Sequence, residues 1–154
     1  MQMNQKLNIR EAMKSDTAAL AALSGELGYP VTLLQMEVRY DKLSTKSDNC
    51  IYVAELDSIV GWIHIAVIQS LESNPFVEIC GLVVAESHRG TGIGTRLIAM
   101  VESWARENGY NHIRVRTNVL REETRRFYGQ VGFQPKKTQE VFDKIINVGG
   151  LISG

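Results

Sequence analysis

The sequence predicts an α/β (α+β) fold, in which a mixed, mostly antiparallel sheet of six to seven strands is flanked by about four helices. Three observations lead to this prediction. Residues 50–84 have the pattern of three consecutive antiparallel strands. A glycine-rich turn and a long amphipathic helix follow, and another strand then completes a β-α-β unit, whose two strands normally run parallel. The third is size: 154 residues, 44% of them hydrophobic, are enough for one domain (1–154) with a substantial core.

The N-terminal third is expected to form a short strand and then two helices. Residues 7–10 alternate between apolar and polar types, as the residues of a half-buried strand do. Ser15 and Asp16 are possible N-caps for the first helix, and Thr32 can cap a second helix that runs to about residue 43. The three strands that follow are expected over residues 50–56, 59–69 and 76–84.

The helix after the glycine-rich turn has the clearest periodicity in the chain. Ile93, Leu97, Val101 and Ala105 recur every four residues and form one apolar stripe. Gly109 can end this helix in a left-handed conformation. A strand over 112–117, a helix over 122–131, two late strands over 133–135 and 139–146, and a frayed tail over 147–154 complete the predicted order β-α-α-β-β-β-α-β-α-β-β.

The charge of the chain is zero overall but unevenly distributed. Residues 1–85 carry six basic and ten acidic side chains, whereas residues 86–137 carry ten basic and five acidic ones. A basic middle segment suits a phosphate-bearing ligand. We expect no nucleic-acid partner, because no basic face interleaved with aromatic residues is present. We also expect no membrane partner and a cytoplasmic location, because the chain has neither a spanning apolar run nor a signal-peptide pattern.

The two cysteines, Cys50 and Cys80, lie in apolar, strand-like contexts and are expected to be buried, reduced thiols. Neither has a partner at the spacing of a metal site, so no metal is expected.

Three glycines at alternate positions, Gly90, Gly92 and Gly94, lie directly before the amphipathic helix. They expose backbone N–H groups at a helix N-terminus, where an anion is favoured. The loop is not a P-loop, because Gly94 is followed by Thr95 and Arg96 instead of lysine. It is not a dinucleotide fingerprint either, because the third glycine of that motif is missing in both possible frames. We therefore expect the loop to hold the pyrophosphate of another coenzyme.

The loop from Arg89 to Gly94 fits Arg-x-x-Gly-x-Gly and resembles the acyl-CoA loop of the GCN5-related N-acetyltransferase (GNAT) family. Residues 125–133 look like a second segment of that family, Phe/Leu-Tyr-x-x-x-Gly-Phe. The predicted order of elements is also that of the family, so the resemblance spans roughly residues 7–146. It implies the GNAT fold and an enzyme that transfers an acetyl group from acetyl-CoA to a primary amine of a small molecule, by direct attack in a ternary complex.

The resemblance also implies roles for individual residues. Tyr128 is the expected general acid, because a phenol that is protonated at neutral pH can give a proton to a departing thiolate. The backbone N–H of Leu82 is the expected oxyanion donor. The residues expected to bind the cofactor are Leu82, Val83, Val84, Arg89, Gly90, Thr91, Gly92, Ile93, Gly94, Thr95, Asn118, Thr124, Phe127 and Tyr128. Thr124 departs from the family, which usually has alanine there, and Phe127 is also expected to pack in the core.

Glu78 is the candidate base. It lies eleven residues before Arg89, the distance at which histone-type members of the family carry a catalytic glutamate. It could take the proton of the amine directly or through a water. An edge carboxylate or a substrate-binding charge is an equally good interpretation, and these interpretations stay open. Glu72 is a second candidate base, and His64 could either line the acceptor site or be structural.

Two alternatives to a small-molecule acetyltransferase remain open at this point. One is an acyl-CoA-binding or sensing module without catalysis, since a fold does not guarantee turnover. The other is a lysine or N-terminal acetyltransferase that acts on proteins. The acidic N-terminal portion favours a cationic acceptor such as a polyamine, an aminoglycoside or a lysine-like group. The resemblance also makes a homodimer through the late strands possible.

Overall fold

The computed structural model describes residues 6–149 and groups the chain into two compact units, one up to Arg116 and one from Thr117 onward. The predicted fraying of residues 150–154 falls outside the described residues.

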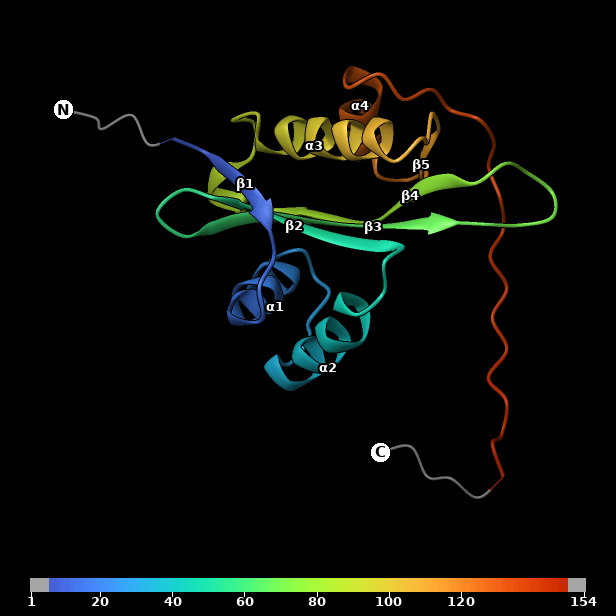
Figure 1. Ribbon diagram of the computed structural model, residues 1–154, viewed down its shortest axis with the longest axis horizontal. Helices are drawn as coiled ribbons and strands as arrows, with labels where there is room; N and C mark the ends of the chain where they lie inside the picture. Colours follow the sequence, from blue (N-terminus) through green and yellow to red (C-terminus); the bar gives the residue numbers. More distant parts are fainter. Residues whose placement is uncertain (1–5, 150–154) are drawn as a thin grey trace. The chain divides into compact units, whose positions relative to one another are not determined.

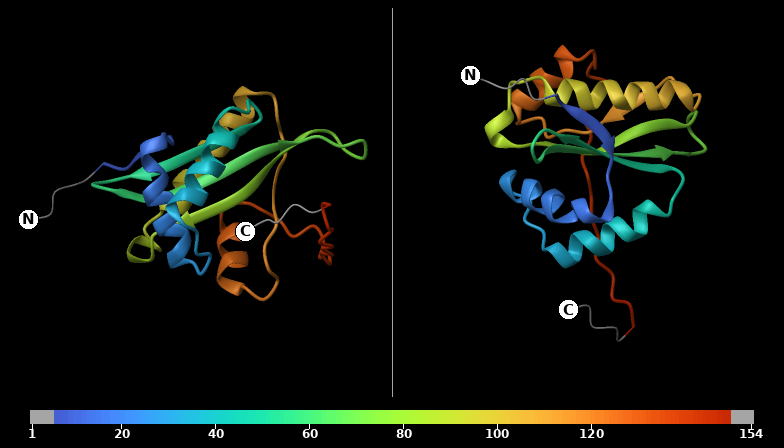
Figure 2. Two further views of the ribbon diagram at one scale, coloured as in Figure 1. Left: turned by 90° about the horizontal axis from the view of Figure 1, so that it is seen from below. Right: turned by 60° about the vertical axis from the view of Figure 1, so that its left-hand side comes forward.

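The first unit is a five-stranded sheet with helices on both faces (Figure 1). The strands follow one another in the order β1-β2-β3-β4-β5, antiparallel except for the parallel pair β4 and β5. Helix α3 covers one face of the sheet, and α1 and α2 cover the other (Figures 1 and 2). The predicted parallel β-α-β unit is therefore confirmed. The elements are β1 (Asn8–Glu11), α1 (Thr17–Glu26), α2 (Leu33–Ser44), β2 (Asn49–Glu55), β3 (Ile59–Ile68), β4 (Phe76–Val84), α3 (Ile93–Glu107) and β5 (Ile113–Val115).

Asp16 lies at the N-cap of α1 but makes no side-chain cap bond there, whereas the start of α2 and the end of α3 are as the sequence predicts. Thr32 accepts a hydrogen bond from the Gln35 backbone N–H (3.1 Å), and the Gln35 side chain accepts one from the Thr32 N–H (3.0 Å), which is a capping box. Gly109 follows the last turn of α3 with φ of 83°, a left-handed conformation that glycine adopts without strain. Local chemistry therefore sets the limits of both helices.

The two faces of β3 are separated by the alternation of its side chains. A Cβ on Gly61 would lie 3.2 Å from Ile93 and 3.3 Å from Leu97, so Gly61 faces α3. Because successive residues of a strand point to opposite faces, Ile63 and Ile65 also lie on this side. We call it the α3 face. On this side Ile63, Ile65 and Val77 of the sheet and Leu97 and Val101 of α3 are all at most 1% exposed.

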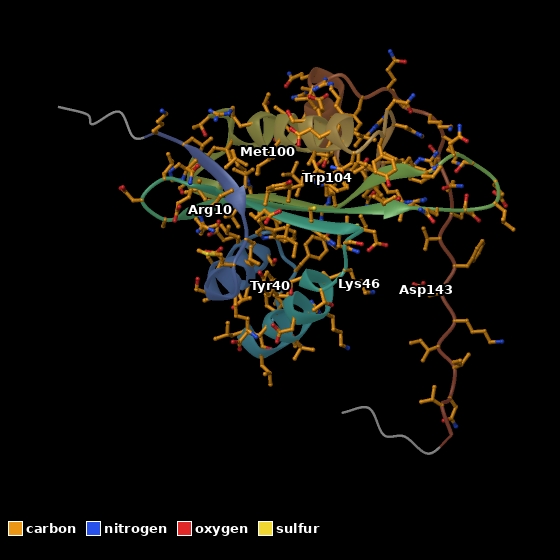
Figure 3. All side chains as sticks on the ribbon, viewed as in Figure 1. Arg10, Tyr40, Lys46, Met100, Trp104 and Asp143 are labelled. Atoms are coloured by element: carbon orange, nitrogen blue, oxygen red, sulfur yellow. The ribbon has the colours of Figure 1, made fainter. Side chains whose placement is uncertain are left out.

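The opposite side of the sheet, the α1/α2 face, carries the even-numbered residues of β3, among them Trp62 and His64. Tyr40 on α2 and Trp104 on α3 mark the two faces (Figure 3). The Tyr40 hydroxyl donates to the Ala12 carbonyl (3.0 Å), so it ties α2 to the segment after β1. Arg10 on β1 pairs with Asp16 (2.8 Å) and lowers the pKa of that carboxyl, which holds the start of α1 to the sheet.

The prediction of six to seven strands is wrong, because the described chain has five. In the second unit α4 (Glu122–Gln130) forms as predicted, but residues 133–135 and 139–146 form no strand. Pro135 interrupts the first segment. The second has apolar residues at suitable positions, but Phe142 and Ile145 are 86% and 96% exposed. Without a neighbouring strand among the described residues, its backbone has no ladder to join.

Candidate active site

The glycine-rich loop leads directly into α3. Gly90 and Gly92 have φ of 77° and 89°, and Gly92 is the N-cap of the helix. No atom lies within 4 Å of a Cβ built on either residue, so it is the backbone conformation that requires glycine. Gly94 differs from the other two, because it lies inside the first turn of α3.

The N-terminus of α3 has the properties of an anion site. The Arg96 N–H bonds to the Gly92 carbonyl (3.0 Å), and the amides before it have no acceptor within the helix. The first turn contains no acidic side chain that would offset the positive end of the helix dipole. Phosphate oxygens are a natural ligand for such a site. The predicted anion loop therefore has suitable local geometry.

The second half of β4 is open on the side of β5. The parallel pairing covers only Val77, Glu78 and Ile79, so among the described residues the 80–84 segment has no partner strand on that edge. A β-bulge leaves Cys80 unpaired with β3, because Ile79 and Gly81 pair with consecutive residues there. An extended ligand could pair with this edge as a further strand does. The loop thus offers a place for phosphate groups and the edge a place for an extended chain.

Glu78 lies on the α1/α2 face, where it pairs across the sheet with Ala66. Its carboxylate is bound by Arg116, whose Nε lies 3.0 Å from Oε1, and its side chain is 19% exposed. The sequence pattern did not predict this ion pair. Glu72, the second candidate base, lies exposed in the turn between β3 and β4.

His64 lies on the same face as Glu78, directly across from Gly81. Its Nε2 is 2.7 Å from the side-chain oxygen of Asn49 on β2, and burial lowers the pKa of its imidazole below the usual value. Sequence reasoning missed Asn49, since only the strand register shows that it reaches His64. The other histidines occupy other places: His88 bonds to Ser87 (2.8 Å), and His112 contacts the Phe76 ring at 5.2 Å.

Trp62 packs over Gly81 on the α1/α2 face. A Cβ on Gly81 would lie 2.9 Å from two carbons of the indole ring, so glycine permits this close approach. In the described part of the chain, Trp62 Nε1 is the only buried side-chain nitrogen or oxygen without a hydrogen-bond partner.

The prediction of two buried thiols is wrong. Both cysteines are free, but Cys50 is half-buried and Cys80 is exposed. Cys80 is the residue that the bulge displaces from regular pairing, which explains its exposure.

The second unit contains Tyr128 on α4. Tyr128 is 8% exposed and makes edge contacts with Phe127 and Phe133, at ring distances of 5.1 and 5.4 Å. Burial raises the pKa of its phenol to about 12, so the group stays protonated at neutral pH. Its oxygen has no hydrogen-bond partner among the described residues, yet it is not sealed from solvent. The unit therefore presents a protonated phenol that can still donate.

The remaining predicted ligands of the second unit lie near Tyr128 in the sequence. Asn118 accepts a hydrogen bond from the Leu120 N–H (2.9 Å), which stabilises the turn before α4. Thr124 and Phe127 are half-buried on the helix.

A cavity lies at the end of α3 opposite the glycine-rich loop. Its volume is about 480 Å³, and Trp104 and Tyr110 form a stacked pair in its wall, 6.1 Å apart. No group of three or more metal-ligating side chains is present within residues 6–149. In the same range, no helix is both long and apolar enough to cross a membrane.

Known proteins resemble this chain both in sequence and in structure. An N-acetyltransferase of Bacillus subtilis (strain 168) with no characterised function, YobR, is 41% identical over 56 residues, which are 35% of this chain and 22% of that protein. An aminoglycoside N(6′)-acetyltransferase type 1 of Serratia marcescens is 30% identical over 66 residues, 43% of this chain and 45% of that protein. The chain thus matches less than half the length of either relative.

Solved structures share the fold over nearly the whole chain. The aminoglycoside N-acetyltransferase AAC(6′)-Iy in complex with CoA superposes with a TM-score of 0.83 at 17% identity, covering 94% of this chain and 98% of the other. Glucosamine-6-phosphate N-acetyltransferase from Arabidopsis thaliana gives 0.76 at 20% identity, covering 90% and 99%. The profile of the acetyltransferase (GNAT) family matches residues 17–133, which is more than half of the sequence. The chain therefore belongs to the GNAT family of acetyltransferases.

Proposed function

We propose that this protein is an acetyl-CoA-dependent N-acetyltransferase that acetylates a primary amine of a small molecule by direct attack in a ternary complex. The observation that carries the proposal is the glycine-rich loop at the uncompensated N-terminus of α3, in the same unit as the open edge of β4. Membership of the GNAT family supports the reaction class. Relatives named as aminoglycoside acetyltransferases support a small, amine-rich acceptor.

Residues of the loop and of β4 would hold the coenzyme, which supplies the acetyl group as a thioester when it is bound. The backbone N–H groups from Arg89 to Thr95 bind the pyrophosphate, and the edge at Leu82, Val83 and Val84 pairs with the arm. The Leu82 N–H donates to the carbonyl oxygen, and one such donor is typically worth about 3 kcal/mol. The family resemblance adds Asn118, Thr124 and Phe127 to this binding site.

Tyr128 is the proposed general acid. Its raised pKa keeps the hydroxyl protonated, and an unpartnered hydroxyl is available to the departing sulfur. Glu78 is proposed either as the base for the amine or as the charge that binds it. We also propose that residues 1–154 act as one cytoplasmic domain that can form a homodimer.

The binding step is tested by two matched glycine variants at the two ends of α3. Gly92→Ala and Gly109→Ala each put a side chain on a glycine with φ above 80° in open space, so similar backbone strain is expected in both. Only Gly92→Ala should weaken acetyl-CoA binding, by tenfold or more in calorimetry. Equal affinities for the two variants would remove the loop from the binding site.

Turnover is tested by free thiol released from acetyl-CoA with a panel of neamine, spermidine and a lysine peptide. The enzyme should release thiol with at least one small amine. Tight binding without release on any amine would favour the sensing module, whereas release with the peptide alone would favour a protein acetyltransferase.

Tyr128→Phe separates the acid step from binding. We expect kcat to fall about 100-fold with little change in the KM for acetyl-CoA, because only the proton donor is lost. An unchanged kcat would exclude Tyr128 from the mechanism.

A further inference from the structure

A chain of hydrogen bonds runs from the loop before β2 to His64 on β3. The Asn49 side-chain Nδ2 donates to the Asp48 carboxylate (2.9 Å), and Asn49 Oδ1 lies 2.7 Å from His64 Nε2. A carboxylate only accepts hydrogen bonds, so Asp48 determines which way the Asn49 amide faces. The amide oxygen therefore faces the imidazole, and Nε2 must carry the hydrogen.

The opposite nitrogen of the His64 ring is a free base. In a neutral imidazole with hydrogen on Nε2, Nδ1 has a lone pair that can accept a proton. Nδ1 has no hydrogen-bond partner among the described residues, and it is not a buried atom closed to solvent. The ring is thus oriented by one nitrogen and left open at the other.

The imidazole of His64 is neutral near pH 7, although charged groups lie on the strands and the helix around it. Burial is the cause that lowers its pKa. On β4 the ionisable neighbours are Glu78, which is bound to Arg116, and the thiol of Cys80. On the helix side, the ionisable residue of α1 is Glu26, whose carboxylate accepts from the Glu86 N–H (2.9 Å). The carboxylate of Asp48 reaches the ring only through Asn49.

Two small residues flank His64 on the α1/α2 face, and the edge of the Trp62 indole lies over one of them, Gly81. Gly81 lies directly opposite the imidazole, and Ala66, two residues further along β3, pairs with Glu78. Directly opposite side chains in an antiparallel pair have Cβ atoms only about 5 Å apart. The imidazole and the Glu78 carboxylate therefore border the same part of the face, beside the bulge and one residue from Leu82.

We propose that His64 Nδ1 accepts the proton of the acceptor's ammonium group, while the Glu78 carboxylate binds that ammonium by charge and Asn49 is the positioning residue for the imidazole. This inference rests on the proposed acetyltransferase function. It resolves the two interpretations of Glu78 in favour of a binding charge, since its carboxylate already has Arg116 as a partner.

The proton balance of the reaction is complete with these groups. One N–H bond of the ammonium breaks, and its proton moves to Nδ1, which leaves a lone pair on the amine nitrogen. The C–N bond forms as the C–S bond breaks, and the leaving sulfur takes a proton from Tyr128. The second amine proton replaces the one that Tyr128 gave. The His64 imidazolium then releases its proton to solvent, so an ammonium and a thioester yield an amide, a thiol and one proton.

The tautomer is tested first, without any substrate. Nitrogen-15 NMR of the imidazole groups should show hydrogen on Nε2 and none on Nδ1 of His64 at pH 7, with titration below the usual pKa of about 6.5. Asn49→Leu should abolish this preference, and the exposed His112 serves as the control ring. Hydrogen on Nδ1 in the wild-type protein, or titration at or above 6.5, would overturn the proposal.

The proton transfer is tested by thiol release with neamine and spermidine as a function of pH. His64→Gln keeps a donor toward Asn49 but removes the base, so kcat should fall about 100-fold and the acidic limb of the profile should disappear. Asn49→Asp should move this limb to higher pH, because a carboxylate beside Nε2 favours the imidazolium. Glu78→Gln should raise the KM for the amine about tenfold and keep the limb.

A control variant and the activity of the wild type distinguish a failure of the role of His64 from a failure of the proposed acetyltransferase function. His112→Gln should leave both the rate and the profile as in the wild type. If the wild type releases thiol and His64→Gln stays within twofold of it with the limb intact, the role of His64 is overturned while the proposed function stands. If the wild type releases no thiol with any amine, the proposed function fails and the role of His64 fails with it.

Discussion

The two faces of β3 and β4 differ sharply although they belong to the same two strands. On the α3 face, Ile63 and Val77 are fully buried against a helix whose Leu97 and Val101 are fully buried too. On the α1/α2 face, Trp62 and His64 of β3 and Glu78 of β4 are only half-buried. The α1/α2 face also has a buried apolar part, since Val53, Val60 and Val83 on it are at most 6% exposed. Its polar and titratable groups are concentrated next to the bulge.

The largest effect is expected from a cavity on the α3 face. Leu97→Ala should lower the free energy of unfolding by about 3 kcal/mol, because Leu97 is fully buried and the emptied space cannot close completely. The matched control is Leu34→Ala on α2, where the same change on a side chain 71% exposed should cost under about 0.5 kcal/mol. Urea unfolding measures both. Similar losses for the two variants would contradict the placement of Leu97 in the packed core.

An intermediate effect is expected from two glycines that face opposite sides. Gly61→Ala should cost about 1–3 kcal/mol, because its Cβ would lie 3.1 Å from the Val83 carbonyl and close to two buried side chains of α3. Gly81→Ala should lower the free energy of unfolding by less than Gly61→Ala does, because the half-buried Trp62 ring can move aside. Urea unfolding and tryptophan fluorescence measure the two changes, and a larger loss for Gly81→Ala would show that the α1/α2 face is the more tightly packed one.

The smallest effect is expected from the titration of His64. Because burial lowers its folded-state pKa, the unfolded chain binds more protons than the folded one between that pKa and about 6.5. The free energy of unfolding should therefore fall as the pH drops below about 6.5, and His64→Gln should flatten this slope between about pH 5 and 7. Asp16→Asn is the control. The lowered pKa of Asp16 contributes stability that is lost at lower pH, below its ordinary value of 3.8, so its removal should leave the slope near pH 6 unchanged. If the slope of the free energy of unfolding against pH is unchanged in His64→Gln, a group other than His64 causes this pH dependence.

Local signals in the sequence predict most of the elements. The four-residue period of α3, the capping box at Thr32 and the glycine after α3 each depend on neighbours a few residues away. The prediction of late strands at 133–135 and 139–146 is wrong, because a strand depends on residues far away in the sequence. A strand is stable only with a neighbour, and the alternation of apolar residues cannot show whether a neighbour exists.

The sequence by itself determined the glycine-rich loop, the helix that follows it and the parallel pair of strands on either side. Backbone conformation, helix periodicity and the right-handed crossover rule are properties of short segments, and they can be recognised without the rest of the molecule. Only the tertiary structure decided that Asn49 orients His64, that Arg116 binds Glu78 and that Cys80 is displaced by a bulge. These contacts join residues on different strands, and the register that sets them depends on how the whole sheet buries its faces.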